Sequence, residues 1–408
     1  MVSERIAVTG VGCVSPAGPD ASSTFDAILQ GRSFGQAMDF DTRGGPPAVG
    51  APVSELPAGR IGEKAMRRMD RGAALAVMAA TEAWEHAAVT GVPTERIGVV
   101  VGTAGGGLSS WERFQPGWAG KGYSTLSPFL APMVMSNSAT AEITLALGVH
   151  GPSWTVTGAC AAGSYGVIEG YRLLREGAAD VVVVAGADAL LTPTIYAVFA
   201  KMGATTRNTD FGRASRPFDV DRDGFVLGEG SGALVLETVR HAEERGAEIL
   251  AEVAGYGVTT DAFHIVAPDP QAAGATRAMQ MAMSSARLDP TDVGHVNAHG
   301  TSTTLNDLAE SVALRACFGE SGPLVTSCKG SIGHLLGGAG AVELVVTVMS
   351  VRSGLVPPIA NTATIDPELC YTSMQIGEAR QIVPRPAIKN SFAFGGHNAS
   401  VAIVPPGW

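Results

Sequence analysis

The sequence predicts an α/β protein built from two similar halves. Strand-like apolar runs alternate with helical stretches along the chain, which is typical of a mostly parallel sheet covered by helices. A similar order of segments then appears twice, and no low-complexity linker separates the two copies. We therefore expect one continuous body rather than domains joined by a flexible chain.

The first half, residues 1–245, contains the clearest strands. The runs "RIAVTGVG", "RIGVVVG" and "ADVVVVAGAD" are short, apolar and rich in β-branched residues, as strands are. Between the first two runs, the stretch "AALAVMAATEAWEHA" predicts a helix. The segment "GACAAGSYGVIEGYRLL" then leads from a turn of small residues into a glycine-spaced helix.

The second half, residues 246–408, repeats this order. "LAEVAGYGVTTD" resembles "RIAVTGVGCVSP", and "VGHVNAHGTS" resembles "IGVVVGTAGG". "TSCKGSIGHLLGGAGAV" is the counterpart of the small-residue turn in the first half. The apolar segment 338–351, which contains "AGAVELVVTVMSV", predicts a helix. We expect this helix to lie between the sheets, because a helix that is hydrophobic all round must be buried.

Composition excludes several classes of protein. Hydrophobic residues make up 46% of the 408 residues and charged residues 16%, which fits a globular protein and not a disordered one. A net charge of −10 disfavours a nucleic-acid surface. No apolar run approaches the roughly 20 residues of a membrane span, and the charged start does not resemble a signal peptide, so we expect a cytoplasmic protein.

One cysteine lies where a reactive thiol is expected. The five cysteines are odd in number and form no C-x-x-C pair, which argues against a disulfide framework and a zinc ribbon. Cys160 precedes a predicted helix, where the backbone dipole and free N–H groups favour the thiolate. The small residues around it leave room for a substrate. An inert, packed cysteine is the alternative interpretation.

Two histidines favour the reactive interpretation. His299 in "VNAHGTSTTLND" follows a predicted strand, where ligands bind in α/β sheets, and His334 lies between glycine-rich turns in "CKGSIGHLLGGAG". The repeated order of segments brings both to a common crevice with Cys160. The three segments lack the local ligand spacing of a zinc site, so we expect no metal. The glycine-rich "VGTAGGG" and "GEGSG" lack the features of a phosphate loop.

Four motifs together resemble one family. "GAC", "NAHGTST", "CKGSIGHLLGGAGAVE" and "NSFAFGGHN" occur in the order and separation found in condensing enzymes, most closely β-ketoacyl-acyl carrier protein synthase II and the type II polyketide ketosynthases. The resemblance covers essentially the whole chain. It implies the thiolase fold, in which two duplicated α/β halves form layers of helix, sheet, helix, sheet and helix, and it implies a dimer.

The reaction that the resemblance implies is a decarboxylative Claisen condensation. Cys160 would take an acyl chain from the phosphopantetheine arm of an acyl carrier protein, and malonyl-acyl carrier protein would supply the extender. No cofactor would be bound permanently. His299 and His334 would hydrogen-bond the extender's thioester oxygen as it becomes an enolate. The N–H groups of Cys160 and Phe394 would form the oxyanion hole, and Phe394 would gate the site.

Further positions follow from the same resemblance. Lys329 and Glu310 would form a buried supporting pair, since a buried lysine needs a partner. The expected substrate-binding residues are Gly105, Met133, Met135, Phe392, Thr301 and Thr303. The basic residues expected to dock the acidic carrier protein are Lys64, Arg67, Arg68 and Arg207. The charge pattern of residues 63–71 alone is equally typical of a solvated helix face.

The chain departs from the family pattern at the acyl tunnel. Gly105 stands where the fatty-acid enzymes carry a bulky aliphatic residue, so we expect extra volume for longer, unsaturated or rigid chains, as polyketide-type synthases handle. Met133 and Met135 are expected to line the same tunnel across the dimer. Ala393 replaces a glycine of the gating loop, which would stiffen the gate.

These observations favour a ketosynthase of type II polyketide or polyene biosynthesis. A housekeeping fatty-acid elongating synthase II is the alternative. A chain-length-setting partner subunit is disfavoured, because such subunits usually lack the reactive cysteine and this chain has Cys160 with both histidines. A homodimer and a heterodimer with a chain-length factor-like subunit are both compatible with the sequence.

Overall fold

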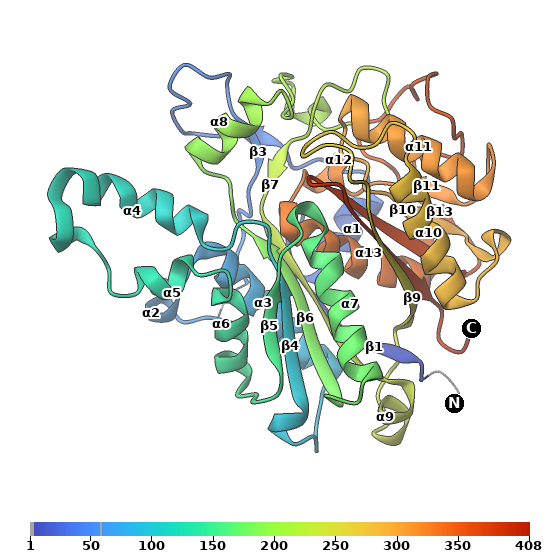
Figure 1. Ribbon diagram of the computed structural model, residues 1–408, viewed down its shortest axis with the longest axis horizontal. Helices are drawn as coiled ribbons and strands as arrows, with labels where there is room; N and C mark the ends of the chain where they lie inside the picture. The colour runs from blue at the N-terminus through green and yellow to red at the C-terminus, as the bar shows by residue number, and fades with distance from the viewer. Residues whose placement is uncertain (1–3, 58) are drawn as a thin grey trace.

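The computed structural model describes residues 4–57 and 59–408 and contains one ten-stranded sheet with helices on its faces (Figure 1). The strands of this sheet are β1 (Ile6–Val14), β4 (Ile97–Gly102), β5 (Ser153–Val156), β6 (Val181–Asp188), β8 (Gly230–Thr238), β9 (Ala251–Thr260), β10 (His295–Asn297), β11 (Leu324–Thr326), β14 (Ala387–Ala393) and β15 (His397–Val404). Two smaller sheets consist of β2 (Gln36–Ala37), β3 (Val49–Ala51) and β7 (Leu227–Gly228), and of β12 (Leu355–Val356) and β13 (Arg380–Gln381).

The α-helices are α1 (Ala21–Leu29), α2 (Glu63–Met66), α3 (Arg71–Ala87), α4 (Leu108–Lys121), α5 (Leu130–Val134), α6 (Ser138–Leu147), α7 (Ala162–Arg175), α8 (Pro193–Lys201), α9 (Val239–Glu244), α10 (Ala273–Ala286), α11 (Thr304–Phe318), α12 (Lys329–Ile332) and α13 (Ala339–Ser353). A short 3-10 helix, η3 (Ala159–Ala161), carries Cys160 directly before α7.

The two halves of the large sheet repeat one strand order. Numbered along the chain within each half, the strands lie in the order third, second, fourth, fifth, first: β5-β4-β6-β8-β1 and β11-β10-β14-β15-β9. The directions agree as well, because in each half the second strand pairs in parallel with both neighbours and the other pairs are antiparallel. The halves join where β1 pairs with β9. The predicted boundary between residues 245 and 246 falls between α9 and β9, and the division of the chain into two halves at this point stays a prediction.

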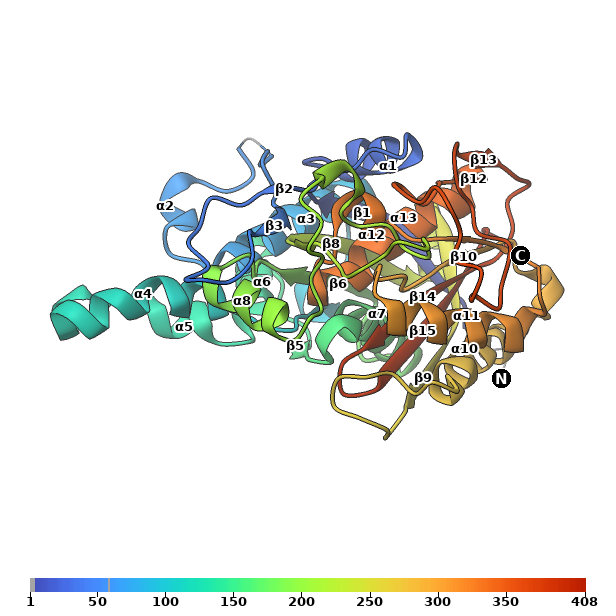
Figure 2. The same cartoon turned by 90° about the horizontal axis from the view of Figure 1, so that it is seen from above.

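Helices cover the two outer faces and fill the space between the halves (Figures 1 and 2). On one outer face α3 packs on β1 and β8, and on the other α10 packs on β9 and β15. Between them lie α7, against β4 and β6, and α13, against β8 and β14. The order of helix, sheet, helix, sheet and helix confirms the predicted fold class.

The middle layer is closely packed because its sequence is apolar and small. β4 and β6 are buried along their whole length, as continuous runs of β-branched residues are in parallel sheets covered on both faces. Gly163 lets α7 approach α13, since a Cβ there would lie 2.7 Å from both Ala341 N and Gly337 O. The predicted helix at 338–351 is α13, and it is buried between the sheets.

One segment of the described chain, Leu336–Ser353, is long and apolar enough by length and composition to cross a membrane, which corrects the expectation that no run approaches this length. However, 83% of this window is buried inside the protein. The segment includes α13, whose apolar residues pack on both halves of the sheet, so it is a core helix.

Candidate active site

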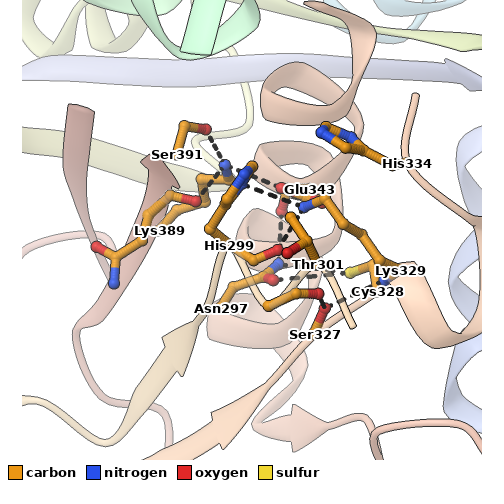
Figure 3. Close-up of polar contacts among 12 residues, drawn as sticks. Asn297, His299, Thr301, Ser327, Cys328, Lys329, His334, Glu343, Lys389 and Ser391 are labelled. Atoms are coloured by element: carbon orange, nitrogen blue, oxygen red, sulfur yellow. Dashed lines mark hydrogen bonds and ion pairs between the residues drawn. The ribbon is translucent and has the colours of Figure 1, made fainter. Parts of the chain in front are cut away.

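The three predicted reactive residues line one cavity of about 380 Å³. Cys160 lies on η3, His299 on the loop after β10, and His334 on the loop after α12. The two imidazole rings meet edge to face with their centroids 5.4 Å apart, and Figure 3 shows them with the polar network behind them. The repeated topology therefore brings together segments that are far apart in the sequence.

Cys160 sits on a tight turn and is almost fully buried. Ala159 before it has a φ of +47°, a left-handed conformation that L-residues rarely adopt, and this turn places the cysteine directly before α7. The amide N–H groups of Cys160 and Phe394 both donate to its sulfur. These are the two groups predicted for the oxyanion hole, and the structure brings them to the same atom.

The expectation that the helix start favours a thiolate is wrong for this structure. Burial raises the pKa of the Cys160 thiol to about 11, and Asp188 adds to the rise. Lys329 and the two amide N–H groups act in the opposite direction but are outweighed. Desolvation of the charged form dominates because the sulfur is removed from water on nearly all sides. The sulfur is thus a protonated thiol at neutral pH.

Both histidines are neutral for the same reason. Burial lowers the pKa of His299 and of His334 well below the ordinary 6.5, and nearby lysines lower it further. The Leu336 N–H donates to His334 Nδ1 at 3.3 Å, and Lys329 Nζ lies 3.4 Å from His299 Nδ1. Because Nδ1 accepts in each ring, we assign the proton to Nε2, which leaves Nε2–H as a donor in each.

Lys329 is paired with Glu343, so the predicted Lys329–Glu310 pair is wrong. Its Nζ lies 2.5 Å from Glu343 Oε1 and donates to the carbonyl oxygen of His299 at 2.6 Å (Figure 3). All of these side chains are buried. Lys329 therefore fixes both the backbone and the ring of His299.

Glu310 shapes the backbone of the same loop. Its carboxylate accepts the N–H of His299 at 2.9 Å and that of Gly300 at 2.8 Å, and Asn390 Nδ2 donates to it at 3.2 Å. Burial raises its pKa to about 7. Glu310 is near the site as predicted, but it holds the loop and not the lysine.

Four further predicted residues line the same cavity: Phe392, Phe394, Thr301 and Thr303. The Phe392 ring lies 6.2 Å from the His299 ring, edge to face. The hydroxyls of Thr301 and Thr303 are 2.8 Å apart and share a hydrogen bond. Phe394 also borders a second cavity, and Cys160 lines both.

The second cavity, of about 620 Å³, has mostly apolar walls and includes Gly105. We expected extra volume for the acyl chain beside Gly105, because glycine has no side chain. This expectation is wrong, since the space is not open. A Cβ there would lie 2.5 Å from Leu190 Cδ1, so Leu190 fills the position. Met133 and Met135 do not line this cavity within one chain: Met133 is buried and Met135 is exposed.

The four basic residues lie on two separate segments of the chain. Lys64, Arg67 and Arg68 are exposed on and after α2, whereas Arg207 is exposed on the segment that follows α8. The Arg207 N–H donates to Asp223, which lines the first cavity. Helices α2 and α8 stand apart in Figures 1 and 2.

Asp188 ties the two sides of the crevice together. Its carboxylate accepts from Thr103 Oγ1 at 2.7 Å, from the N–H groups of Ala104 and Gly105 at 2.8 and 3.1 Å, and from the Gly337 N–H at 2.7 Å. Burial raises its pKa to about 6. It thereby fastens the loop after β4 to the loop that carries His334.

Sequence reasoning missed four residues of this site: Asp188, Leu190, Glu343 and Lys389. A signal was present for two of them. Glu343 is an acidic residue inside the apolar stretch "AGAVELVVTV", and Lys389 is a lysine in an otherwise buried strand. Charged residues in such positions are rare unless they are paired, so they could have been matched to Lys329.

A search for metal ligands finds no group of three or more His, Cys, Asp or Glu side chains that could hold a metal ion among residues 4–57 and 59–408.

Comparison with known families identifies residues 3–242 as "Beta-ketoacyl synthase, N-terminal domain" and residues 250–363 as "Beta-ketoacyl synthase, C-terminal domain". The chain belongs to the β-ketoacyl synthase family. It is an acyl-transferring condensing enzyme, as predicted. Two relatives of this β-ketoacyl synthase are named 3-oxoacyl-acyl-carrier-protein synthase 2. That of Synechocystis sp. is 40% identical over 98% of this chain and 97% of its own length, and that of Staphylococcus aureus is 38% identical over 97% of each.

Solved structures of ketosynthases share the fold. A β-ketoacyl synthase from Burkholderia phymatum is 32% identical with a TM-score of 0.90, covering 98% of this chain and 99% of its own. The ishigamide ketosynthase/chain length factor is 30% identical with a TM-score of 0.90, covering 100% of both chains. A type II PKS ketosynthase in complex with its acyl-carrier protein is 26% identical with a TM-score of 0.91, covering 99% of this chain and 100% of its own.

The raised thiol pKa predicts how Cys160 reacts with iodoacetamide. Because only the thiolate is alkylated and the pKa is about 11, the rate should rise about tenfold for each pH unit between pH 7 and pH 9. Peptide mass spectrometry measures the rate at Cys160 separately from the other cysteines, and Cys160→Ser gives the background. A rate that levels off below pH 8 would show that the sulfur is ionised near neutrality.

Proposed function

We propose that the chain catalyses the decarboxylative condensation of an acyl chain held on Cys160 with malonyl-acyl carrier protein. The observation that carries the proposal is the shared cavity, in which one sulfur lies with two neutral imidazoles whose Nε2–H groups are available as donors. Neutral donors suit a reaction in which a carbonyl oxygen becomes negative, because they strengthen their hydrogen bonds as the charge develops.

The first step is acyl transfer. Cys160 Sγ attacks the carbonyl carbon of the acyl thioester, the new C–S bond forms, and the bond to the phosphopantetheine sulfur breaks. The thiol proton of Cys160 passes to the departing phosphopantetheine thiol, so the charge balances. In the tetrahedral intermediate, the former carbonyl oxygen of the thioester carries the negative charge. The N–H groups of Cys160 and Phe394 stabilise this oxyanion.

The second step joins two carbon chains. The malonyl group on its carrier loses CO₂, and the electron pair moves into an enolate whose oxygen accepts hydrogen bonds from His299 and His334. The enolate carbon attacks the acyl carbon on Cys160, a C–C bond forms and the C–S bond breaks. The sulfur takes up one proton and the 3-oxoacyl product stays on the carrier. Thr301 and Thr303 line the cavity where the phosphopantetheine arm would lie.

An acyl carrier protein is the proposed partner, together with a second ketosynthase-type chain in the cytoplasm. The structural relative solved with its acyl-carrier protein and the ketosynthase/chain length factor complex support this assignment. In this chain β5 forms one end of the sheet, and Trp154 on β5 and Leu145 on the adjoining helix α6 are exposed. An exposed apolar surface beside a sheet edge favours pairing with another chain.

Two pathways use this chemistry. The names of the curated relatives support elongation of fatty acids. Type II polyketide assembly, the pathway we expected from the sequence, is supported by the ketosynthase/chain length factor relative and by the type II PKS ketosynthase relative. Leu190 fills the space beside Gly105 and lines the apolar cavity, so its side chain limits the room for a long or rigid chain.

The reaction is tested by supplying an acyl carrier substrate and then malonyl-acyl carrier protein to the full-length protein. We expect an acyl adduct on Cys160 by mass spectrometry, followed by CO₂ and 3-oxoacyl product in equal amounts. His299→Ala and His334→Ala should still form the adduct but release CO₂ about 100-fold more slowly, because they lose one enolate donor each. An adduct without CO₂ release from the wild type would identify an acyltransferase instead.

The accepted chain length tests the role of Leu190. Leu190→Ala should lengthen the products because it opens the apolar cavity, and Gly105→Ile should shorten them because it drives Leu190 into that cavity. Product lengths are measured by mass spectrometry of the acyl carriers, with Val383→Ala, an exposed position between β13 and β14, as the control. Product lengths identical to those of the wild type in both Leu190→Ala and Gly105→Ile would exclude both residues as determinants.

Carrier recognition tests the basic residues after α2. Arg68 stacks on the Phe129 ring with its guanidinium carbon 4.7 Å from the ring centre, and charge reversal at Arg67 and Arg68 should raise the apparent KM for the acyl carrier substrate about tenfold at low salt. The effect should shrink at high salt. Arg380→Glu on β13 is the matched control. An unchanged KM at low salt would remove these residues from the carrier site.

A further inference from the structure

A second buried lysine, Lys389, has no part in the reaction described above. It lies on β14, its side chain is fully buried, and Figure 3 shows its contacts with Ser391 and Glu343. Its Nζ donates to the Asn390 carbonyl oxygen at 2.6 Å and to Ser391 Oγ, and it lies 2.9 Å from Glu343 Oε2. Burial lowers the pKa of Lys389, whereas its ion pair with Glu343 acts in the opposite direction and favours the ammonium form.

Lys389 and Lys329 share one carboxylate. Glu343 Oε1 is 2.5 Å from Lys329 Nζ, and Oε2 is 2.9 Å from Lys389 Nζ. One carboxylate balances one ammonium, so the cluster keeps an excess of positive charge. Glu310 is the further acidic group that acts on Lys389, but its carboxylate is already bound to two backbone N–H groups and burial raises its pKa to about 7. It offsets the excess only in part.

Both lysines of the cluster act on the two imidazoles. Burial is the largest cause that lowers the pKa of His299 and His334, and both lysines act in the same direction. Lys329 and Asp188 are the main charged groups that act on the pKa of the Cys160 thiol, and they act in opposite directions. A change at Lys389 therefore tests the histidine chemistry, and acyl transfer to Cys160 in the same variant is the internal comparison.

We propose that Lys389 is a positioning residue for decarboxylation. By holding one oxygen of Glu343 it places a second positive charge behind His299 and His334, keeps both rings in the neutral form that donates from Nε2, and favours the enolate anion. The inference rests on the proposed function, since the enolate forms only when a malonyl extender loses CO₂. Acyl transfer to Cys160 does not use Lys389.

Lys389→Met tests this role, because methionine keeps an unbranched side chain but has no charge. Two half-reactions of the full-length protein are measured against pH: acyl transfer to Cys160 by mass spectrometry, and CO₂ release from malonyl-acyl carrier protein by the acylated protein. Acyl transfer should stay within about twofold of the wild type. CO₂ release at pH 7 should fall about tenfold, because the enolate loses a nearby positive charge. The acid limb of the profile of CO₂ release against pH, where the rate falls as the pH is lowered, should move up by about one pH unit, because each imidazole becomes easier to protonate.

Two further variants separate charge from packing. Lys389→Gln keeps a hydrogen-bond donor without the charge and should behave like Lys389→Met. Ser391→Ala removes one neutral contact of Lys389 and should leave the acid limb in place. Three results would assign Lys389 to core stability and overturn the proposal. These are an unmoved acid limb in Lys389→Met and Lys389→Gln, an equal loss of both half-reactions, and failure of both variants to fold. If the wild type releases no CO₂, the proposed function itself fails, which is a distinct result.

Discussion

The buried carboxylate of Glu343 is the interaction on which the rest of the site depends. It lies on α13, in the middle layer, and receives Lys329 from α12 and Lys389 from β14. Lys329 then bonds the carbonyl oxygen of His299. Loss of one partner from a buried ion pair typically costs about 3–5 kcal/mol, because the other charge remains in the core. The catalytic loop is therefore anchored to the fold by electrostatics as well as by packing.

Burial has opposite consequences for the two kinds of reactive group. It raises the pKa of Cys160 to about 11, and it lowers the pKa of His299 and His334. In both cases the charged form is disfavoured, so the cavity holds an uncharged thiol and two uncharged rings in front of a positively charged cluster. A negative charge that develops on a bound thioester is the charge that such an arrangement stabilises.

The sequence predicted the features that depend on local pattern. Apolar runs marked the strands, the repeated motifs corresponded to the repeated strand order, and Cys160 met both histidines in one cavity. The partner of Lys329 was not predictable in this way, because the choice between Glu310 and Glu343 depends on which carboxylate reaches the ammonium in three dimensions. The filled space beside Gly105 and the protonated thiol also depend on tertiary packing, which outweighs the local effect of a helix start.

The charge state of the two imidazoles tests this account most directly. Protein labelled with ¹³C at histidine Cε1 allows each ring to be followed by NMR between pH 5 and pH 8, with single substitutions at His299 and His334 to assign the signals. We predict that both rings keep the neutral, Nε2-protonated form through pH 6.5, the ordinary midpoint for histidine. A midpoint at or above pH 6.5 for either ring would contradict the account.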